Sequence, residues 1–168
     1  MPDVSDCIGP REHISVLAIN SKGLVLVVQK EGYYEKLWRL PHCARTYALA
    51  THAAGQHRID ESAIKTLLKR TIACDESGVG QMRDTGERAH FTYPKDTRVY
   101  DSQTTLQLYR DQDLVFYTAE LLCPDDSLKK GQRVVGFTLA KKENVAGFLT
   151  SPEREAVLRI MEKYVVVG

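Results

Sequence analysis

Carboxylate side chains occur in two pairs near the middle of the chain. Asp60 and Glu61 form the first pair, and Asp75 and Glu76 form the second. Grouped carboxylates can bind a hard cation such as Mg²⁺ or transfer protons in catalysis. Acids also favour polar loops and the first turn of a helix, where they suit the helix dipole. We therefore expect these four acids to be helix-end and loop residues.

Cationic side chains surround and separate the two acidic pairs. Lys65 and Lys69 are four residues apart, so a helix would place them on one face, and Arg70 follows directly. Arg45 and Arg58 come earlier and could extend the same surface. Cationic side chains repel a metal ion, but they can contact phosphate groups or an acidic partner. Lysines and arginines at this spacing also occur on helix faces that contact only solvent. The sequence therefore predicts no metal, cofactor or catalytic site here, and these five residues are candidate contacts with RNA or a partner.

Histidines and cysteines show no metal-ligand spacing and no C-x-x-C pair. We expect the histidines to lie at the surface or in loops, and the cysteines to be free thiols in a reducing compartment. The residues concerned are His13, His42, His52, His57 and His90, and Cys7, Cys43, Cys74 and Cys123.

The composition is that of an ordinary globular protein. The 168 residues are 43% hydrophobic and 27% charged, and this length suits one domain. The formal charge of +1 gives no general attraction to nucleic acid, so any contact with RNA must be local. No apolar run approaches the ~20 residues needed to cross a bilayer, and we expect no membrane partner.

Apolar and β-branched runs predict a sheet. Residues 13–20 and 23–30 are typical of a β-hairpin, with Gly23 available for positive φ at the turn. Residues 37–40 indicate a short strand that Pro41 ends, because proline cannot donate to a sheet. Further strands are predicted at 87–93, at 115–122 and at 132–140, the last of them buried on both faces.

Two segments have apolar residues at helical spacing. Residues 60–73 carry them on one face, with Asp60 and Glu61 in the first turn. The last helix is expected to begin at Ser151-Pro152-Glu153, which supply an N-cap, a first-turn proline and a first-turn acid. Residues 42–58 have no period and are expected to form a long loop. This order of strands and helices predicts an α/β layer sandwich, with residues 1–12 as an N-terminal extension and 13–168 as one domain.

The order of a hairpin, the segment LWRLP at 37–41, a loop and a helix resembles Nudix hydrolases. In that family an L-W-x-L-P-G-G segment leads into the Nudix box, G-x5-E-x7-R-E-U-x-E-E-x-G-U, where U is a bulky aliphatic residue. The resemblance implies an α/β/α sandwich with a mixed sheet. It also implies a Mg²⁺ site on the box glutamates, which would activate water against a pyrophosphate.

The box can be aligned with this chain in two registers. If Leu67 fills the aliphatic position, Lys69 and Arg70 occupy the positions of the glutamate pair. If Gly55 and Glu61 match the first glycine and glutamate, the pair falls on Ala73 and Cys74. Neither register keeps the glutamate pair, so we expect a protein that is not an enzyme.

Among degenerate Nudix-fold proteins, the chain resembles family forty-six of the mitochondrial large ribosomal subunit. The segment AIKTL at 63–67 is similar to its A-x-R-T-L helix, and HFTYP at 90–94, VFY at 115–117 and TLAKKE at 138–143 match later segments. The resemblance implies a structural protein of the mitochondrial matrix. Its partners would be neighbouring ribosomal proteins and, through a local basic patch, rRNA. The last helix and residues 42–58 are further candidate contact surfaces.

Two other functions stay open. The chain could be a non-catalytic subunit that binds a nucleotide or an RNA end in an RNA-processing complex. It could also be an active Mg²⁺-dependent Nudix hydrolase whose acids come from elsewhere, for which Glu61, Asp75 and Glu76 are the candidates. Convergence of three carboxylates at one cavity would favour the hydrolase.

Overall fold

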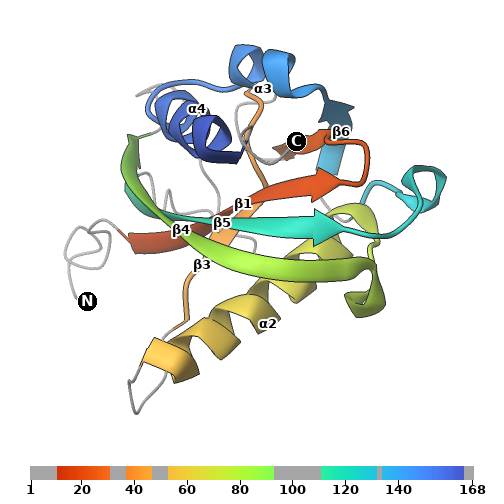
Figure 1. Ribbon diagram of the computed structural model, residues 1–168, viewed down its shortest axis with the longest axis horizontal. Coiled ribbons are helices and arrows are strands. Elements are labelled where there is room, and N and C mark those ends of the chain that lie inside the picture. The colour runs from red at the N-terminus through yellow and green to blue at the C-terminus, as the bar shows by residue number, and fades with distance from the viewer. Residues whose placement is uncertain (1–10, 31–36, 47–52, 93–110, 132–133, 165–168) are drawn as a thin grey trace, which may run out of the picture.

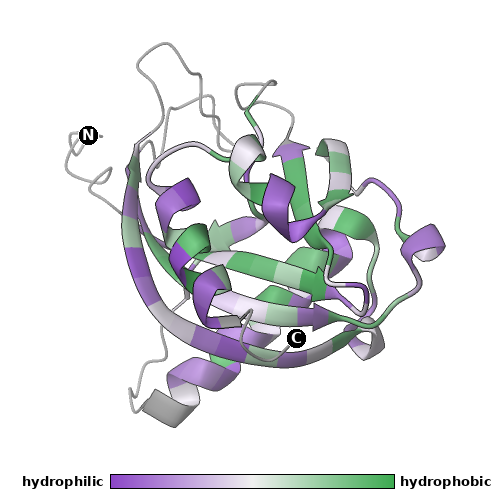
Figure 2. Cartoon of the chain, turned by 45° about the horizontal axis from the view of Figure 1, so that its top comes forward, coloured by the Kyte–Doolittle hydropathy of each residue, from purple (hydrophilic) through white to green (hydrophobic). Residues whose placement is uncertain are grey.

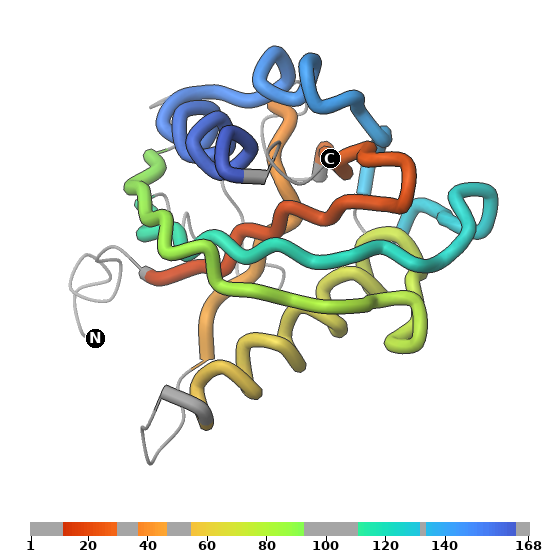
Figure 3. The backbone as a smooth tube through the Cα atoms, in the orientation of Figure 1, coloured from red at the N-terminus to blue at the C-terminus, as the bar shows by residue number. Residues whose placement is uncertain are grey.

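A mixed sheet forms the middle layer of the protein. The computed structural model describes residues 11–30, 37–46, 53–92, 111–131 and 134–164. The sheet order is β4-β5-β1-β2-β6, and β3 also pairs with β1. The strands β1 and β5 are parallel and the other pairs are antiparallel (Figure 3). The strands are β1 (Arg11–Asn20), β2 (Val25–Lys30), β3 (His42–Ala44), β4 (Val79–Thr92), β5 (Asp111–Leu121) and β6 (Val134–Ala140).

Helices cover both faces of this sheet (Figure 1). The long helix α2 (Ala53–Ile72) lies on one face, and α3 (Lys142–Phe148) and α4 (Glu153–Tyr164) lie on the other. Two short 3-10 turns, η1 (Glu76–Gly78) and η2 (Asp125–Ser127), precede β4 and β6. The predicted α/β/α sandwich with a mixed sheet is therefore confirmed. Among the described helices, none is both long and apolar enough to cross a membrane.

Alternating side chains of the central strands fill two hydrophobic cores. On β5, Val115 and Tyr117 point to the core beneath α2, whereas Leu114 and Phe116 point to the core beneath α3 and α4. This alternation follows from the two-residue period of a strand. The central strands are accordingly mostly hydrophobic, while the edge strand β4 carries many hydrophilic residues (Figure 2).

Several sequence predictions agree with these elements. The first two strands form the expected antiparallel hairpin, and Gly23 has a φ of +78° in its turn. The strand predicted at 115–122 is β5, and the helix predicted near the C-terminus is α4. Their apolar periods were clear in the sequence because each element buries one complete face.

The segment after the hairpin differs from the prediction. Residues 37–40 form only an isolated bridge between Arg39 and Val28. The predicted strand before Pro41 is therefore absent, and the strand β3 begins just after Pro41. The expected loop at 42–58 contains β3 and the first turns of α2. Those turns escaped prediction because Gly55, Gln56 and their neighbours are polar or small and give no apolar period.

Later elements also differ in extent and burial. The strand β4 begins at Val79, eight residues before the predicted start at 87, because its alternating polar residues face solvent at the sheet edge. The strand β6 is mostly half-buried rather than buried on both faces, because it lies at the other edge. The short helix α3 was not predicted, since seven residues are too few to show a helical period.

Candidate functional site

The end of α2 decides how the Nudix box aligns with this chain. Ala73 follows the helix with a φ of +57°, and its N–H donates to the carbonyl oxygen of Lys69 at 3.1 Å. Helices commonly end at a residue in the left-handed conformation whose N–H donates to the carbonyl oxygen four residues earlier, and this residue is usually glycine. Ala73 therefore corresponds to the glycine that ends the box. Leu68 and Cys74, both buried, then fall on the two aliphatic positions.

This register differs from both registers that the sequence suggested. In it, none of the four glutamate positions of the box holds an acid. The first glutamate corresponds to Arg58, and the glutamate of the R-E pair to Leu67. The final glutamate pair corresponds to Arg70 and Thr71. Leu67 and Thr71 are buried, and the Thr71 hydroxyl donates to the carbonyl oxygen of Leu67 at 2.6 Å. The other two glutamate positions hold Arg58 and Arg70, which are both exposed.

The cations of α2 form one basic face. Arg58, Lys65 and Lys69 follow each other along one side of the helix, at spacings of seven and four residues. The backbone N–H groups of Lys129 and Gly131 donate to the carbonyl oxygens of Ile72 and Thr71 at 3.1 and 2.9 Å. These bonds bring a second basic segment to the end of the helix. The basic face comprises Arg58, Lys65, Lys69, Arg70, Lys129 and Lys130, of which Lys65 is half-buried and the others are exposed.

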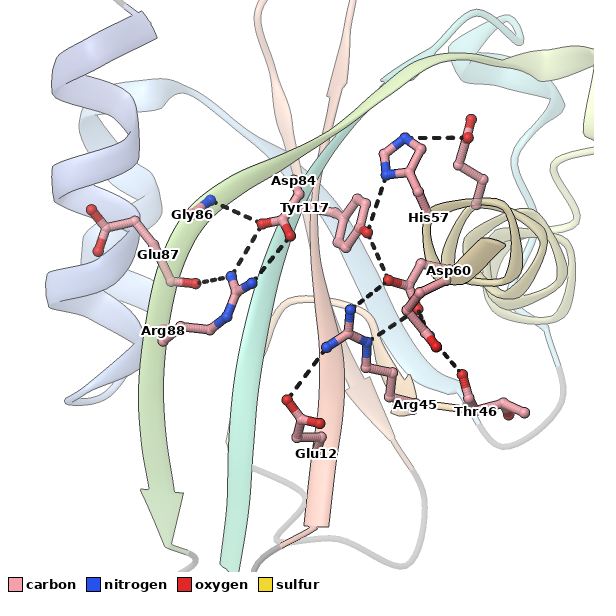
Figure 4. A network of polar contacts seen from close by, with 12 residues as sticks. Glu12, Arg45, Thr46, His57, Asp60, Asp84, Gly86, Glu87, Arg88 and Tyr117 are labelled. Atoms are coloured by element: carbon pink, nitrogen blue, oxygen red, sulfur yellow. Dashed lines mark hydrogen bonds and ion pairs between the residues drawn. The ribbon is translucent and has the colours of Figure 1, made fainter. Parts of the chain in front are cut away.

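Arg45 lies elsewhere, in a buried network around Asp60 (Figure 4). Its guanidinium donates to both carboxylate oxygens of Asp60, at 3.2 and 2.8 Å, and also contacts Glu12 at 3.3 Å. The Arg45 side chain is only 13% exposed, and the hydrogen bonds to Asp60 raise its pKa. Asp60 itself is fully buried in the third turn of α2 and not a helix-end acid as predicted. The candidate contact residues are therefore divided between the basic face and this network.

Two further donors complete the shell of Asp60. The Tyr117 hydroxyl donates to Oδ2 at 2.7 Å, and the Gln56 amide donates to Oδ1 at 2.9 Å. Burial and the hydrogen bond to Asp60 raise the pKa of Tyr117, so this group keeps its proton. The His57 ring lies at 31° to the Tyr117 ring, with 5.8 Å between the ring centres. Its Nδ1 lies 3.4 Å from the Tyr117 hydroxyl, and its Nε2 contacts Glu61 at 3.2 Å. The Asp60 carboxylate thus has four donors and serves the fold rather than a ligand.

The remaining acids near α2 do not gather into a metal site. In the described part of the chain, no three His, Cys, Asp or Glu side chains lie close enough to hold a metal ion. Glu61 pairs with His57, while Asp75 and Glu76 lie beyond the helix end. The residues at the box positions therefore do not fit the Mg²⁺ that the Nudix resemblance implies, because Mg²⁺ requires oxygen ligands.

A second buried network, which the sequence did not indicate, surrounds Arg39. Its guanidinium donates to His42, Gln112 and Glu153 at 3.0, 2.9 and 3.0 Å and lies 4.0 Å from the Phe91 ring centre. Because Arg39 is a donor, His42 accepts on Nε2 and donates from Nδ1 to the carbonyl oxygen of Leu40.

This network corrects two predictions. Glu153 is buried beside Arg39 rather than serving only the first turn of α4, and its second oxygen accepts from the Leu40 N–H at 3.2 Å. His13 and His42 are buried rather than at the surface, whereas His90 is exposed as expected and His52 lies outside the described residues. No local sequence pattern predicts this network, because the partners lie up to 114 residues apart.

Solved structures with the Nudix fold resemble this chain over nearly its whole length. The E. coli dihydroneopterin triphosphate pyrophosphohydrolase matches with a TM-score of 0.62 at 12% identity, covering 95% of this chain and 99% of the other. The MutT protein from Methanosarcina mazei matches with a TM-score of 0.61 at 12% identity, covering 92% and 96%. The Nudix domain of Shewanella oneidensis NrtR in complex with ADP ribose matches with a TM-score of 0.58 at 11% identity, covering 97% and 93%.

Sequence comparisons add no relative to these structures. No protein-family model matches the chain, and no curated protein matches its sequence. The likeness therefore lies in the order and packing of the elements, from the hairpin through α2 to α4. The chain has the Nudix fold.

Proposed function

We propose that this chain is a Nudix-fold protein without hydrolase activity, which acts as a docking component of the mitochondrial large ribosomal subunit. The observation that carries the proposal is the content of the box positions on α2. Where the family has four glutamates, this chain has Arg58, Leu67, Arg70 and Thr71. A Mg²⁺ ion would find two positive charges, an alkyl group and a hydroxyl committed to its own helix.

The acids that remain cannot easily replace the lost ones. Asp60 is the only buried acid of α2, and its carboxylate accepts four hydrogen bonds from Arg45, Tyr117 and Gln56. Binding a metal there would leave a buried guanidinium without its partner, which costs several kcal/mol. Hydrolysis through displaced acids is therefore disfavoured.

The basic face supplies a surface for docking instead. In the described residues, none of its six side chains forms an ion pair, so their charges are available to a partner. The formal charge of the whole chain is only +1, so attraction to an anionic partner is concentrated at this face. Phosphate groups of rRNA have the complementary charge and bind such clusters without base recognition. The ribosomal assignment itself rests on the resemblance of residues 63–67 and the later segments to family forty-six.

Sedimentation of the full chain with ribosomes tests this proposal. Tagged protein expressed in its own cells is expected to co-sediment with large ribosomal subunits in a density gradient. A triple charge reversal, Lys65→Glu, Lys69→Glu and Arg70→Glu, should move most of it to the free fraction. The control reverses two cations at the start of α3, on the opposite side of the sheet, Lys141 and Lys142, and should stay bound. Free sedimentation of the unmodified protein would contradict the ribosomal role.

A second experiment separates binding from catalysis. The full chain with Mg²⁺ is incubated with dihydroneopterin triphosphate, diadenosine tetraphosphate and ADP ribose, which represent the compounds named for structures of this fold. We expect no product above the buffer blank. Product formation in proportion to protein concentration would overturn the non-catalytic assignment and favour a hydrolase with displaced acids.

A further inference from the structure

Two cysteines that are distant in sequence meet beside the end of α2. The Sγ atoms of Cys74 and Cys123 are 2.8 Å apart, well inside the separation of unbonded sulfur atoms. Cys74 directly follows Ala73 at the end of the helix, and Cys123 lies two residues after the end of β5. Their proximity could not be predicted from the sequence, in which they are 49 residues apart.

The surrounding backbone holds the two thiols together. Gly78 lies under them, and a Cβ atom at this position would be 2.8 Å from Sγ of Cys74 and 3.0 Å from Cβ of Cys123. The Gly78 N–H donates to the carbonyl oxygen of Asp75, and its own carbonyl oxygen accepts from the N–H of Leu122, both at 2.8 Å. These bonds fix the segments on either side of each cysteine. The absence of a side chain at Gly78 provides the space that the sulfur atoms occupy.

We propose that Cys74 and Cys123 form a reversible intramolecular disulfide by exchange with a small-molecule disulfide such as oxidised glutathione. A disulfide bond of about 2.05 Å requires the two sulfur atoms to approach by less than 1 Å. Neither cysteine belongs to the basic face, and the proposal does not depend on the proposed docking role.

The two thiols have different parts in the exchange. Cys123 is half-buried and Cys74 is only 1% exposed, so an external disulfide reaches Cys123 first. Burial and the hydrogen bond to Cys123 raise the pKa of Cys74 to about 12, so Cys74 keeps its proton while the more exposed Cys123 makes the first attack. It attacks one sulfur of glutathione disulfide and releases one glutathione thiolate. Cys74 then gives its proton to the released glutathione thiolate and attacks the Cys123 sulfur of the mixed disulfide, which releases the second glutathione as a thiolate. Two protein thiols are oxidised and one disulfide is reduced.

Mass spectrometry of the full chain in glutathione buffers tests this exchange. As the ratio of oxidised to reduced glutathione rises, the protein is expected to become lighter by two hydrogen atoms. A non-reducing digest should contain the Cys74 peptide joined to the Cys123 peptide, and reductant should separate them. A wild-type protein that keeps both thiols in excess oxidised glutathione, or that stops at a glutathione adduct, would overturn the proposal.

Cysteine variants assign the chemistry to this pair. The double variant Cys7→Ser and Cys43→Ser keeps only the proposed pair and should form the same crosslink at the same ratio. Cys74→Ser should instead accumulate a stable glutathione adduct on Cys123, because the resolving thiol is missing. Equal crosslinking through Cys7 or Cys43 would contradict the assignment.

A glycine variant tests the geometry. Gly78→Ala should slow disulfide formation at least tenfold, because the new methyl group displaces one of the sulfur atoms. Gly147→Ala is the matched control, since its Cβ would meet no atom within 4 Å. If Gly78→Ala is unfolded by circular dichroism, the cysteine variants alone decide the question. If a folded Gly78→Ala protein forms the disulfide at the wild-type rate, the space at Gly78 is not what holds the two thiols together.

Discussion

The Tyr117 hydroxyl donates a 2.7 Å hydrogen bond to Oδ2 of Asp60 and so joins the middle of β5 to α2 (Figure 4). Arg45, which follows β3, donates to the same carboxylate. One buried acid thus fixes the position of the helix against two strands. In a helix whose box positions hold no acid, this carboxylate has become a structural anchor.

Removal of donors or charge at this anchor should destabilise the protein in a defined order. Tyr117→Phe is expected to lower the free energy of unfolding by about 1.5–3 kcal/mol, the range for hydrogen bonds to charged groups. Asp60→Asn should cost more, about 3–5 kcal/mol, because it leaves the Arg45 guanidinium with less compensation. Urea unfolding measures both. Glu61→Gln, which affects only a half-exposed pair with His57, should change stability by less than about 0.5 kcal/mol. The reverse order would mean that Asp60 is not the anchor.

A turn in β4 should make stability depend on acidic pH. Burial tends to raise the pKa of Asp84, but hydrogen bonds from Arg88 and the Gly86 N–H outweigh it, and the net pKa is lowered. A carboxylate with a lowered folded-state pKa stabilises the protein above its unfolded-state value of about 3.9, and this contribution disappears as pH falls through the folded-state pKa. The stability difference between wild type and Asp84→Asn should therefore shrink below about pH 4. A difference that stays constant from pH 6 to 2.5 would contradict this.

The left-handed residue at the end of α2 offers a stabilising substitution. A non-glycine residue in this conformation destabilises the protein by roughly 1–2 kcal/mol. Glycine removes this strain, but it adds an entropy cost of about 0.5–1 kcal/mol on folding. We expect Ala73→Gly to raise the free energy of unfolding by up to about 1 kcal/mol. Ala63→Gly, inside the same helix, should lower it by about 1 kcal/mol. Chemical denaturation of both variants distinguishes a helix end at Ala73 from a helix that continues.

The second basic segment should depend on a close backbone approach. A Cβ atom at Gly131 would overlap the carbonyl oxygen of Arg70, which is backbone and cannot move freely. Gly131→Ala is expected to cost about 1–3 kcal/mol and to loosen the segment that carries Lys129 and Lys130. Amide hydrogen exchange at Gly131 and Lys129 should then accelerate relative to wild type. Gly147→Ala should leave the exchange at these amides unchanged and should raise stability by about 0.5–1 kcal/mol, because Gly147 lies inside the helix α3.

Oxidation of the cysteine pair should stabilise the protein. The disulfide would close a loop from residue 74 to residue 123, and restriction of the unfolded chain by a loop of this length contributes about 4 kcal/mol. The urea midpoint of the crosslinked wild type should therefore exceed that of the reduced protein. Cys123→Ser should show the same midpoint under both redox conditions. A lower midpoint for the oxidised wild type would show that the bond strains the native structure.

Local sequence patterns sufficed for elements that bury one continuous face. Ile64, Leu67 and Leu68 predicted the second half of α2, and the hairpin around Gly23 was equally clear. The first turns of α2 were missed because their side chains are polar and the helix there is stabilised by contacts such as Gln56 with Asp60.

The site depended on relationships that no local pattern contains. Asp60 is buried because of Arg45 and Tyr117, which lie 15 and 57 residues away in sequence. The register of the box depended on Ala73, whose left-handed conformation has no sequence signal because alanine favours helices. The loss of the final glutamate pair could still be predicted, since it holds in every register considered.

The parallel pairing of β1 with β5 has a consequence for how the chain folds. Each pair in this ladder joins residues 101 positions apart, from Arg11 with Gln112 to Asn20 with Leu121. Both strands lie in the middle of the sheet, so neither hydrophobic core can close before β5 has been synthesised. Such non-local contacts slow folding, because the entropy of a long loop is lost before its contacts form. During synthesis, the apolar residues of the hairpin and of α2 therefore stay exposed to solvent until β5 has been synthesised. The nascent chain should depend on chaperones at least until Leu121 has emerged, and the core beneath α3 and α4 closes only after these helices follow.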